Sequence, residues 1–163
     1  MPLSTLQLAA NVSVSLQKTV TGWPSITQGP DVIQWDLSDT DLSVFTQAYA
    51  AIHTINASGS TTIDLQSFTN LATESVTLTK ALAMVVTVSG ATGILKIQPG
   101  ASNGLAAWFF GSTDGVILAH GDKLAIARDP TLTPVTVDGT HKTIKLENTG
   151  AATITVTIVI IGG

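Results

Sequence analysis

Hydrophobic and polar residues alternate along most of the second half of the chain. One face of residues 153–161 carries four apolar side chains: Ile154, Val156, Ile158 and Ile160. Threonines hold the opposite face, and a period of two residues is typical of a half-buried β-strand. After Thr157 the polar face disappears, because Val159 and Ile161 take the positions that threonine held. We therefore expect the end of this strand to be covered on both sides, by its own domain or by a neighbouring subunit.

Short β-patterned segments recur along the whole chain, separated by turns rich in glycine and small polar residues. They are residues 6–16, 32–37, 61–65, 75–88, 93–98, 116–119, 123–128, 133–137, 143–147 and 153–161. Many short strands at this spacing predict an all-β chain, folded as an antiparallel sandwich or a barrel.

Residues 39–55 fit two kinds of secondary structure. Apolar residues three or four positions apart are typical of a helix, and this segment has them at Leu42, Phe45, Tyr49 and Ile52. Residues 44–55 followed by a five-residue loop and residues 61–65 also fit two strands of a hairpin. We favour the strand, because β-branched residues become more frequent toward Ile55.

The N-terminal region is predicted to be separate from the sandwich. Residues 17–31 contain two prolines, two glycines and Trp23, and they show no sustained periodicity. We therefore divide the chain into an N-terminal arm or docking segment, residues 1–31, and a β-sandwich domain, residues 32–163. Apolar and polar residues alternate over residues 6–16, so this segment could add a strand to another subunit's sheet. The docking residues expected in the arm are Leu6, Leu8, Val12, Val14, Leu16 and Trp23.

The composition favours assembly. Charged residues are 11% of the chain, 25 of the 163 residues are threonine, and the mean hydropathy is +0.40. Since about a quarter of an average protein is charged, much of the exterior is expected to be covered in a homo-oligomer, for which we expect a trimer. The expected interface residues are Trp108, Phe109, Phe110, Ile158, Val159, Ile160 and Ile161.

The charge and composition also argue against two classes of partner, nucleic acids and membranes. The net charge is −4, and no cluster of Lys and Arg offers a surface for phosphates, so direct nucleic-acid binding is not expected. No apolar run approaches the roughly 20 residues of a membrane helix, and the N-terminus lacks the pattern of a signal peptide. We expect synthesis in a cytoplasm and no membrane partner.

No catalytic or metal site is predicted, so we expect no enzyme activity and no cofactor. His53, His120 and His141 are far apart in sequence and have no metal-ligand spacing. No Gly-x-Ser-x-Gly motif accompanies the serines. Asp36, Asp39 and Asp41 lack the spacing of a calcium loop, and they are interpreted as turn caps in a solvated acidic segment.

The aromatic residues leave two interpretations open. Exposed aromatic rings stack on sugars, whereas buried ones supply large contact area in cores and interfaces. For Trp108, Phe109 and Phe110 we favour a subunit interface, because consecutive aromatics on a strand point to both faces. Trp23, in the arm, is the better candidate for an exposed ring.

From Ile63 onward the order of segments resembles small structural proteins of tailed-bacteriophage virions, of the decoration, head-fibre or minor capsid type. The segments that carry the resemblance are TTIDLQSF, ESVTLTKALAMVVTVSGATGILKIQPGASN, DGVILAHGDKLAIARD and TIKLENTGAATITVTIVIIGG. The resemblance implies a jelly-roll-like sandwich that is homo-oligomeric and mounted on a virion, with a major capsid or other virion protein as partner. The alternative function is a carbohydrate-binding or receptor-binding module.

Overall fold

The computed structural model describes residues 12–18, 26–33, 47–69, 75–90, 92–109, 111–128 and 134–163. The chain divides into two compact units: Ser4–Leu42, and Ser43–Gly163 together with Met1–Leu3.

The first unit contains a two-stranded antiparallel ribbon of β1 (Val12–Lys18) and β2 (Ile26–Ile33). The ribbon pairs Val12 with Ile33 and Lys18 with Ile26, and its register shifts between Val14 and Leu16. A register shift of this kind is a β-bulge, an extra residue on one strand. Residues 32 and 33, expected at the start of the sandwich, therefore pair inside the ribbon.

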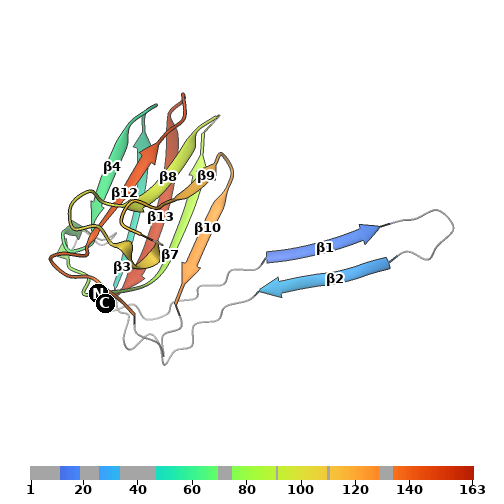
Figure 1. The fold of residues 1–163 in the computed structure, drawn as a ribbon, viewed down its shortest axis with the longest axis horizontal. Helices are drawn as coiled ribbons and strands as arrows, with labels where there is room; N and C mark the ends of the chain where they lie inside the picture. Colours follow the sequence, from blue (N-terminus) through green and yellow to red (C-terminus); the bar gives the residue numbers. More distant parts are fainter. Residues whose placement is uncertain are drawn as a thin grey trace. The chain divides into compact units, whose positions relative to one another are not determined.

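The second unit is an antiparallel β-sandwich, which confirms the predicted fold class (Figure 1). One sheet has the order β10-β7-β13-β3, with β11 also pairing with β7, and the other has the order β4-β12-β8-β9. A separate two-stranded sheet pairs β5 (Phe68–Thr69) with β6 (Ser75–Val76). The strands of the first sheet are β3 (Gln47–Ile55), β7 (Lys80–Ser89), β10 (Lys123–Ala127), β11 (Val135–Thr136) and β13 (Ile154–Gly162). Those of the second are β4 (Ser60–Asp64), β8 (Ile94–Pro99), β9 (Val116–Ala119) and β12 (Thr143–Asn148).

The core lies between the two sheets and is built by the period-two pattern. In β13 the side chains of Ile154, Val156, Ile158 and Ile160 all point inward, and each is at most 1% exposed. The facing sheet contributes Leu95, Ile97, Ile144 and Leu146, all fully buried. Alternation along each strand therefore decides which residues form the core.

The ambiguous segment forms a strand. Over residues 47–55, β3 pairs in continuous register with β13, from Gln47 opposite Gly162 to Ile55 opposite Ile154. The apolar spacing that suggested a helix arises because β3 has apolar residues on both of its faces. The strand prediction is confirmed for this part, and residues 39–46 lie outside the described residues.

The end of β13 is anchored to the start of β7. The Gly163 carbonyl accepts hydrogen bonds from the Thr79 and Lys80 amides, both at 2.8 Å. A side chain at Gly162 would overlap with the Lys80 carbonyl, so the backbones approach as closely as only glycine allows. This contact fixes the register of the two central strands at their shared end.

Candidate functional site

The outer face of the five-stranded sheet is almost uncharged. Its outward positions come in cross-strand rows, such as Thr54, Thr155 and Ser89, or Ala50, Val159, Val85 and Ala125. Among the outward positions of β3, β13, β7 and β10, two residues are charged, Lys80 and Lys123, and each is the first residue of its strand. The rest are mainly threonine, serine, alanine, valine and isoleucine, so hydroxyl and methyl groups make up most of this face.

Part of this face is accessible. Ile52 on β3 is 71% exposed, Thr157 is exposed, and Val85 and Val159 are half-buried. Apolar side chains that stay accessible on a sheet face mark interaction sites when they gather on one surface. We call this surface, the outward positions of β3, β13, β7 and β10, the uncharged face.

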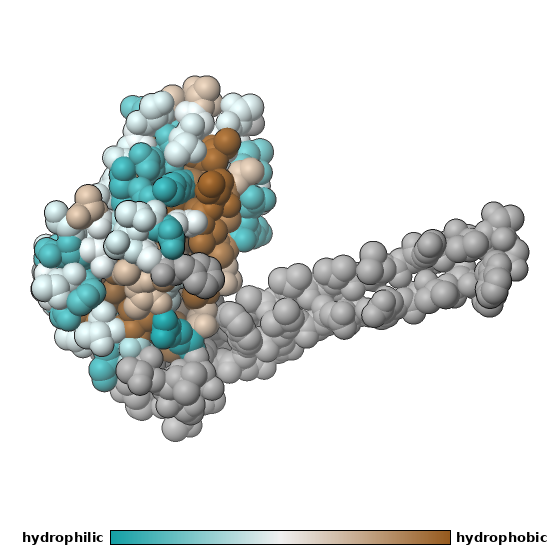
Figure 2. All heavy atoms as spheres, in the orientation of Figure 1, coloured by the Kyte–Doolittle hydropathy of each residue, from teal (hydrophilic) through white to brown (hydrophobic). Residues whose placement is uncertain are grey.

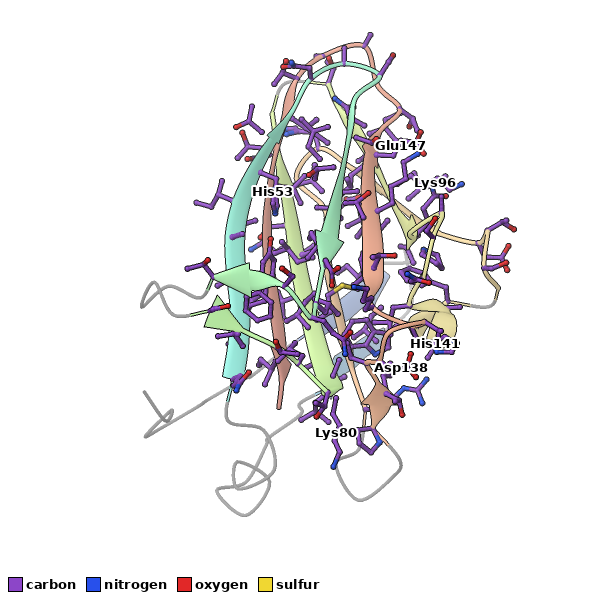
Figure 3. All side chains as sticks on the ribbon, turned by 90° about the vertical axis from the view of Figure 1, so that its left-hand side faces the viewer. His53, Lys80, Lys96, Asp138, His141 and Glu147 are labelled. Carbon is purple, nitrogen blue, oxygen red and sulfur yellow. The ribbon has the colours of Figure 1, made fainter. Side chains whose placement is uncertain are left out.

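The outer face of the four-stranded sheet has a different character. Lys145 Nζ lies 3.1 Å from Glu147 Oε1, and Gln98 Nε2 donates to Glu147 Oε2 at 3.0 Å. Lys96 is the cross-strand neighbour of Glu147, and the two lie side by side in Figure 3. Oppositely charged cross-strand neighbours of this kind are typical of a solvated sheet face.

An apolar stripe runs along β9 and the first residue of β8 at the edge of this second face (Figure 2). Its exposed members are Ile117, at 66%, and Ile94, at 40%. The stripe is narrow, because Lys96 pairs with Ile117 and interrupts it on the β8 side. The wider interaction surface is therefore the uncharged face.

The three histidines lie apart. His53 points between the sheets from β3, and its Nε2 lies 2.8 Å from the Tyr49 hydroxyl. The Phe68 ring packs edge-on against the Tyr49 ring, with 5.0 Å between the ring centroids. Burial lowers the pKa of His53 and raises the pKa of Tyr49. His120 is exposed beside the turn between β9 and β10.

His141 belongs to an exposed turn around Asp138. The Asp138 carboxylate accepts hydrogen bonds from the Thr140 hydroxyl and from the Thr140 and His141 amides, with His141 Nδ1 also at 3.1 Å. These hydrogen bonds, from Thr140 first, lower the pKa of Asp138 to about 2. All of these hydrogen bonds lie within one turn, so they stabilise its local conformation. In the part of the chain that the structure describes, no three His, Asp or Glu side chains gather closely enough to hold a metal ion.

The aromatic cluster is placed differently from expectation. Residues 106–108 form a 3₁₀ turn, η1 (Ala106–Trp108), and Phe109 follows it, so these rings are not alternate positions of a strand. Trp108 and Phe109 are half-buried against the protomer's own core. The loop is held there by Thr143, whose carbonyl accepts from the Gly100 and Leu105 amides at 3.0 and 2.9 Å. The strand geometry behind the interface expectation is wrong, and Phe110 lies outside the described residues.

The four expected interface residues on β13 divide into two groups. Ile158 and Ile160 are fully buried in the core, so the interface expectation is wrong for these two. Ile161 points to the outer side but is only 2% exposed within the single chain, which fits cover by its own domain. Val159 is half-buried on the uncharged face and remains a predicted interface residue.

Three of the expected docking residues lie on the ribbon. Val12, Val14 and Leu16 are positions of β1, and that strand pairs with β2 of the same chain. Leu6, Leu8 and Trp23 lie outside the described residues, as does Trp35. The docking role of this region stays a prediction.

The contact between Tyr49 and His53 was not predicted from the sequence. Residues four apart on a strand share a face, so their contact follows once residues 47–55 are taken as a strand. The uncharged face was also missed as a whole. Its rows of alanine, valine and threonine come from four strands that are distant in sequence, although the low overall charge was a signal for it.

No protein-family model matches the chain, and no curated protein is significantly similar to it. Within the described ranges, no helix combines the length and hydrophobicity needed to cross a membrane.

Proposed function

We propose that the chain is a non-enzymatic structural protein of a bacteriophage virion, a capsid decoration or minor capsid protein that forms homo-oligomers and docks on the particle. The observation that carries the proposal is the uncharged face. A sheet face with charges only at two strand ends, Lys80 and Lys123, suits contact with another protein surface better than permanent contact with water.

The strand order gives further support. Taken in chain order, β3 and β4, β7 and β8, β9 and β10, and β12 and β13 each join one sheet to the other. The resulting sheets, β10-β7-β13-β3 and β4-β12-β8-β9, have the order of two interlocked Greek keys. That order supports the jelly-roll form of the sandwich, which is widespread among capsid proteins. Jelly rolls also occur in lectins, so the order supports the architecture more than the function.

The ribbon supports a docking role for the N-terminal region. Among the described strands, β1 and β2 pair only with each other, and an isolated pair of strands is marginally stable in water. The pairing of β1 with β2 is therefore expected to be completed by a partner, such as a major capsid protein. We therefore keep the docking role for the segment expected at residues 1–31, which contains β1 and most of β2.

Rebinding to particles tests the proposal. Virions purified on a density gradient should contain the chain in a fixed multiple copy number, and purified chain should rebind to particles from which it has been stripped. Val159→Asp should abolish rebinding, because it places a charge on the uncharged face. The matched control is Thr62→Asp on the exposed outer side of β4, which should rebind normally. A chain that stays with soluble protein on the gradient, and instead binds glycans, would favour the carbohydrate-binding alternative.

A further inference from the structure

The free edges of the two sheets are not protected equally. An unpaired strand edge can pair with another chain, and proteins normally prevent this with short strands, charged residues or local bonds. The β9 edge has four residues, and at Ala119 both the amide and the carbonyl are already bonded to Asp122, at 2.8 and 3.1 Å. The β10 edge begins with Lys123, and the β4 edge ends with Asp64, which pairs with Lys142 at 2.8 Å.

The β3 edge has none of these protections. Its nine residues, QAYAAIHTI, include no charged residue, no glycine and no proline. Among the described residues, no strand pairs with the side of β3 that faces away from β13. Ile52, in the middle of the strand, is 71% exposed. An edge this long and this uncharged would cause aggregation if it stayed open, so it is suited to a specific strand partner.

The register identifies which backbone groups are free at this edge. The Val88 amide donates to the Asp122 carbonyl, so even-numbered residues of β7 bond toward β10 and odd-numbered ones toward β13. By the same alternation, the even-numbered residues of β13 bond toward β3, where Ile158 lies opposite Ala51. The amides and carbonyls of the even-numbered β3 residues, Ala48, Ala50, Ile52 and Thr54, therefore point to the open edge.

We propose that the β3 edge pairs with β3 of a second copy of this chain, antiparallel across a two-fold axis at Ala51. In this register Ile52 of one copy lies opposite Ala50 of the other. Each exposed isoleucine side chain therefore faces a small alanine side chain. On the inner side, Tyr49 lies opposite His53 of the other copy. The two uncharged faces become continuous across the joined sheets.

The second copy fits this edge better than the chain's other free strands. β1 ends in Lys18, and β2 contains Gly29, Pro30 and Asp31, a combination that disfavours regular pairing. β3 itself has no charged residue to oppose another copy, and its central residues are the small Ala50 and Ala51. The contact is isologous, so it produces a dimer in place of the trimer expected from composition.

This inference rests on the homo-oligomeric part of the proposed function and names the surface that would form it. Ala50→Pro in the full chain tests it. The Ala50 amide points to the open edge, so its removal costs the sandwich no hydrogen bond but blocks the added strand. The matched control is Thr62→Pro on β4. The Thr62 amide also points to an open edge, because the flanking bonds from Leu65 to Lys142 and from Asn148 to Gly59 place the odd-numbered residues of β4 against β12.

Light scattering and thermal melting are the measurements. Wild type and Thr62→Pro should have the mass of a dimer at about 50 µM, and Ala50→Pro should be a folded monomer. Thr54→Pro, which removes another amide at the same edge, should behave like Ala50→Pro and replaces it if that variant does not fold. The proposal would be overturned by a wild type that is monomeric or trimeric, or by proline variants at β3 that stay dimeric. It would also be overturned if Thr62→Pro became monomeric like Ala50→Pro.

An engineered cysteine tests the register. The chain has no cysteine, so Ala51→Cys introduces a single thiol at the two-fold axis. Opposed residues in a non-hydrogen-bonded antiparallel pair have Cα atoms about 4.5 Å apart, within the range for a disulfide. Oxidation should give a covalent dimer, whereas Thr62→Cys should not. Particle rebinding separates the two proposals. A dimer that fails to rebind overturns the virion function alone, and a trimer that rebinds overturns the β3 pairing alone. A monomer that rebinds overturns the β3 pairing and the homo-oligomer but leaves the docking role.

Discussion

The side chain of Asn148 donates a hydrogen bond to the backbone carbonyl of Ile55, 93 residues earlier in the chain, at 3.1 Å. The same amide group reaches the carbonyls of Asn56 and Ala152, at 3.0 and 2.7 Å, and the Asn148 carbonyl oxygen accepts from the Gly150 amide. Asn148 is fully buried. One side chain thus joins the turn after β3 to the turn between β12 and β13.

We predict that Asn148→Ala destabilises the sandwich. Removal of the side chain leaves buried carbonyls without a donor, which costs about 1–3 kcal/mol in the free energy of unfolding. Asn148→Asp should cost more, because a carboxylate would face the same carbonyls. Urea unfolding measures both. Equal stability of Asn148→Ala and wild type would show that water replaces the amide at this end of the sandwich.

Gly93→Ala should destabilise the protein, and Gly139→Ala should not. A side chain at Gly93 would overlap with Cγ2 of Ile154, which belongs to the core, whereas nothing lies within 4 Å of the corresponding position at Gly139. Overpacking of this kind costs about 1–3 kcal/mol. The comparison of the two melting temperatures tests the packing between the turn before β8 and the first residue of β13. Similar values for the two variants would contradict that packing.

His53 should make stability depend on pH. Burial lowers its pKa in the folded state below the ordinary value of 6.5. The unfolded chain therefore binds more protons in this range, so the contribution is complete above pH 6.5 and is lost as the pH falls toward the folded-state pKa. When the pH is lowered from 7.5 to 5.5, the melting temperature should fall less for His53→Gln than for wild type. His120→Gln, at an exposed position, should retain the wild-type dependence.

Val159 and Ile161 should respond differently to charge. Ile161→Asp buries a carboxylate at a position that is 2% exposed within the chain, so we expect it to unfold the sandwich. Val159→Asp lies on the uncharged face, where the carboxylate can reach water, and should remain folded. Circular dichroism distinguishes the two outcomes. A folded Ile161→Asp variant would mean that the end of β13 is open in the isolated chain.

Metal analysis should find no stoichiometric ion. After dialysis against a chelator, we expect the purified chain to contain less than one zinc, calcium or iron per molecule and to melt at an unchanged temperature. A bound metal that disappears on substitution of His53, His120 or His141 would contradict this and would revive the metal interpretation of the histidines.

Much of the fold was predictable because the strand signal is local. The period-two pattern identified β9 at its observed bounds and placed β4, β8, β10, β12 and β13 to within a residue or two. The ribbon was less predictable, since the pairing of Val12 with Ile33 joins a regular run to a stretch that contains Gly29 and Pro30. The aromatic loop was also missed, because its place against the core depends on bonds to Thr143.

The sequence by itself determined that the chain forms strands and which side chains of each strand share a face, because alternation depends only on neighbouring residues. It could not determine that β13 lies at the centre of a sheet, or that β3 lies at an edge. Those properties depend on strand order: β13 is central because β3 and β7 pair with it on both sides, so Ile158 is buried, while β3 has β13 on one side only. Pairing between residues about 100 positions apart decides this, and only the tertiary structure contains it.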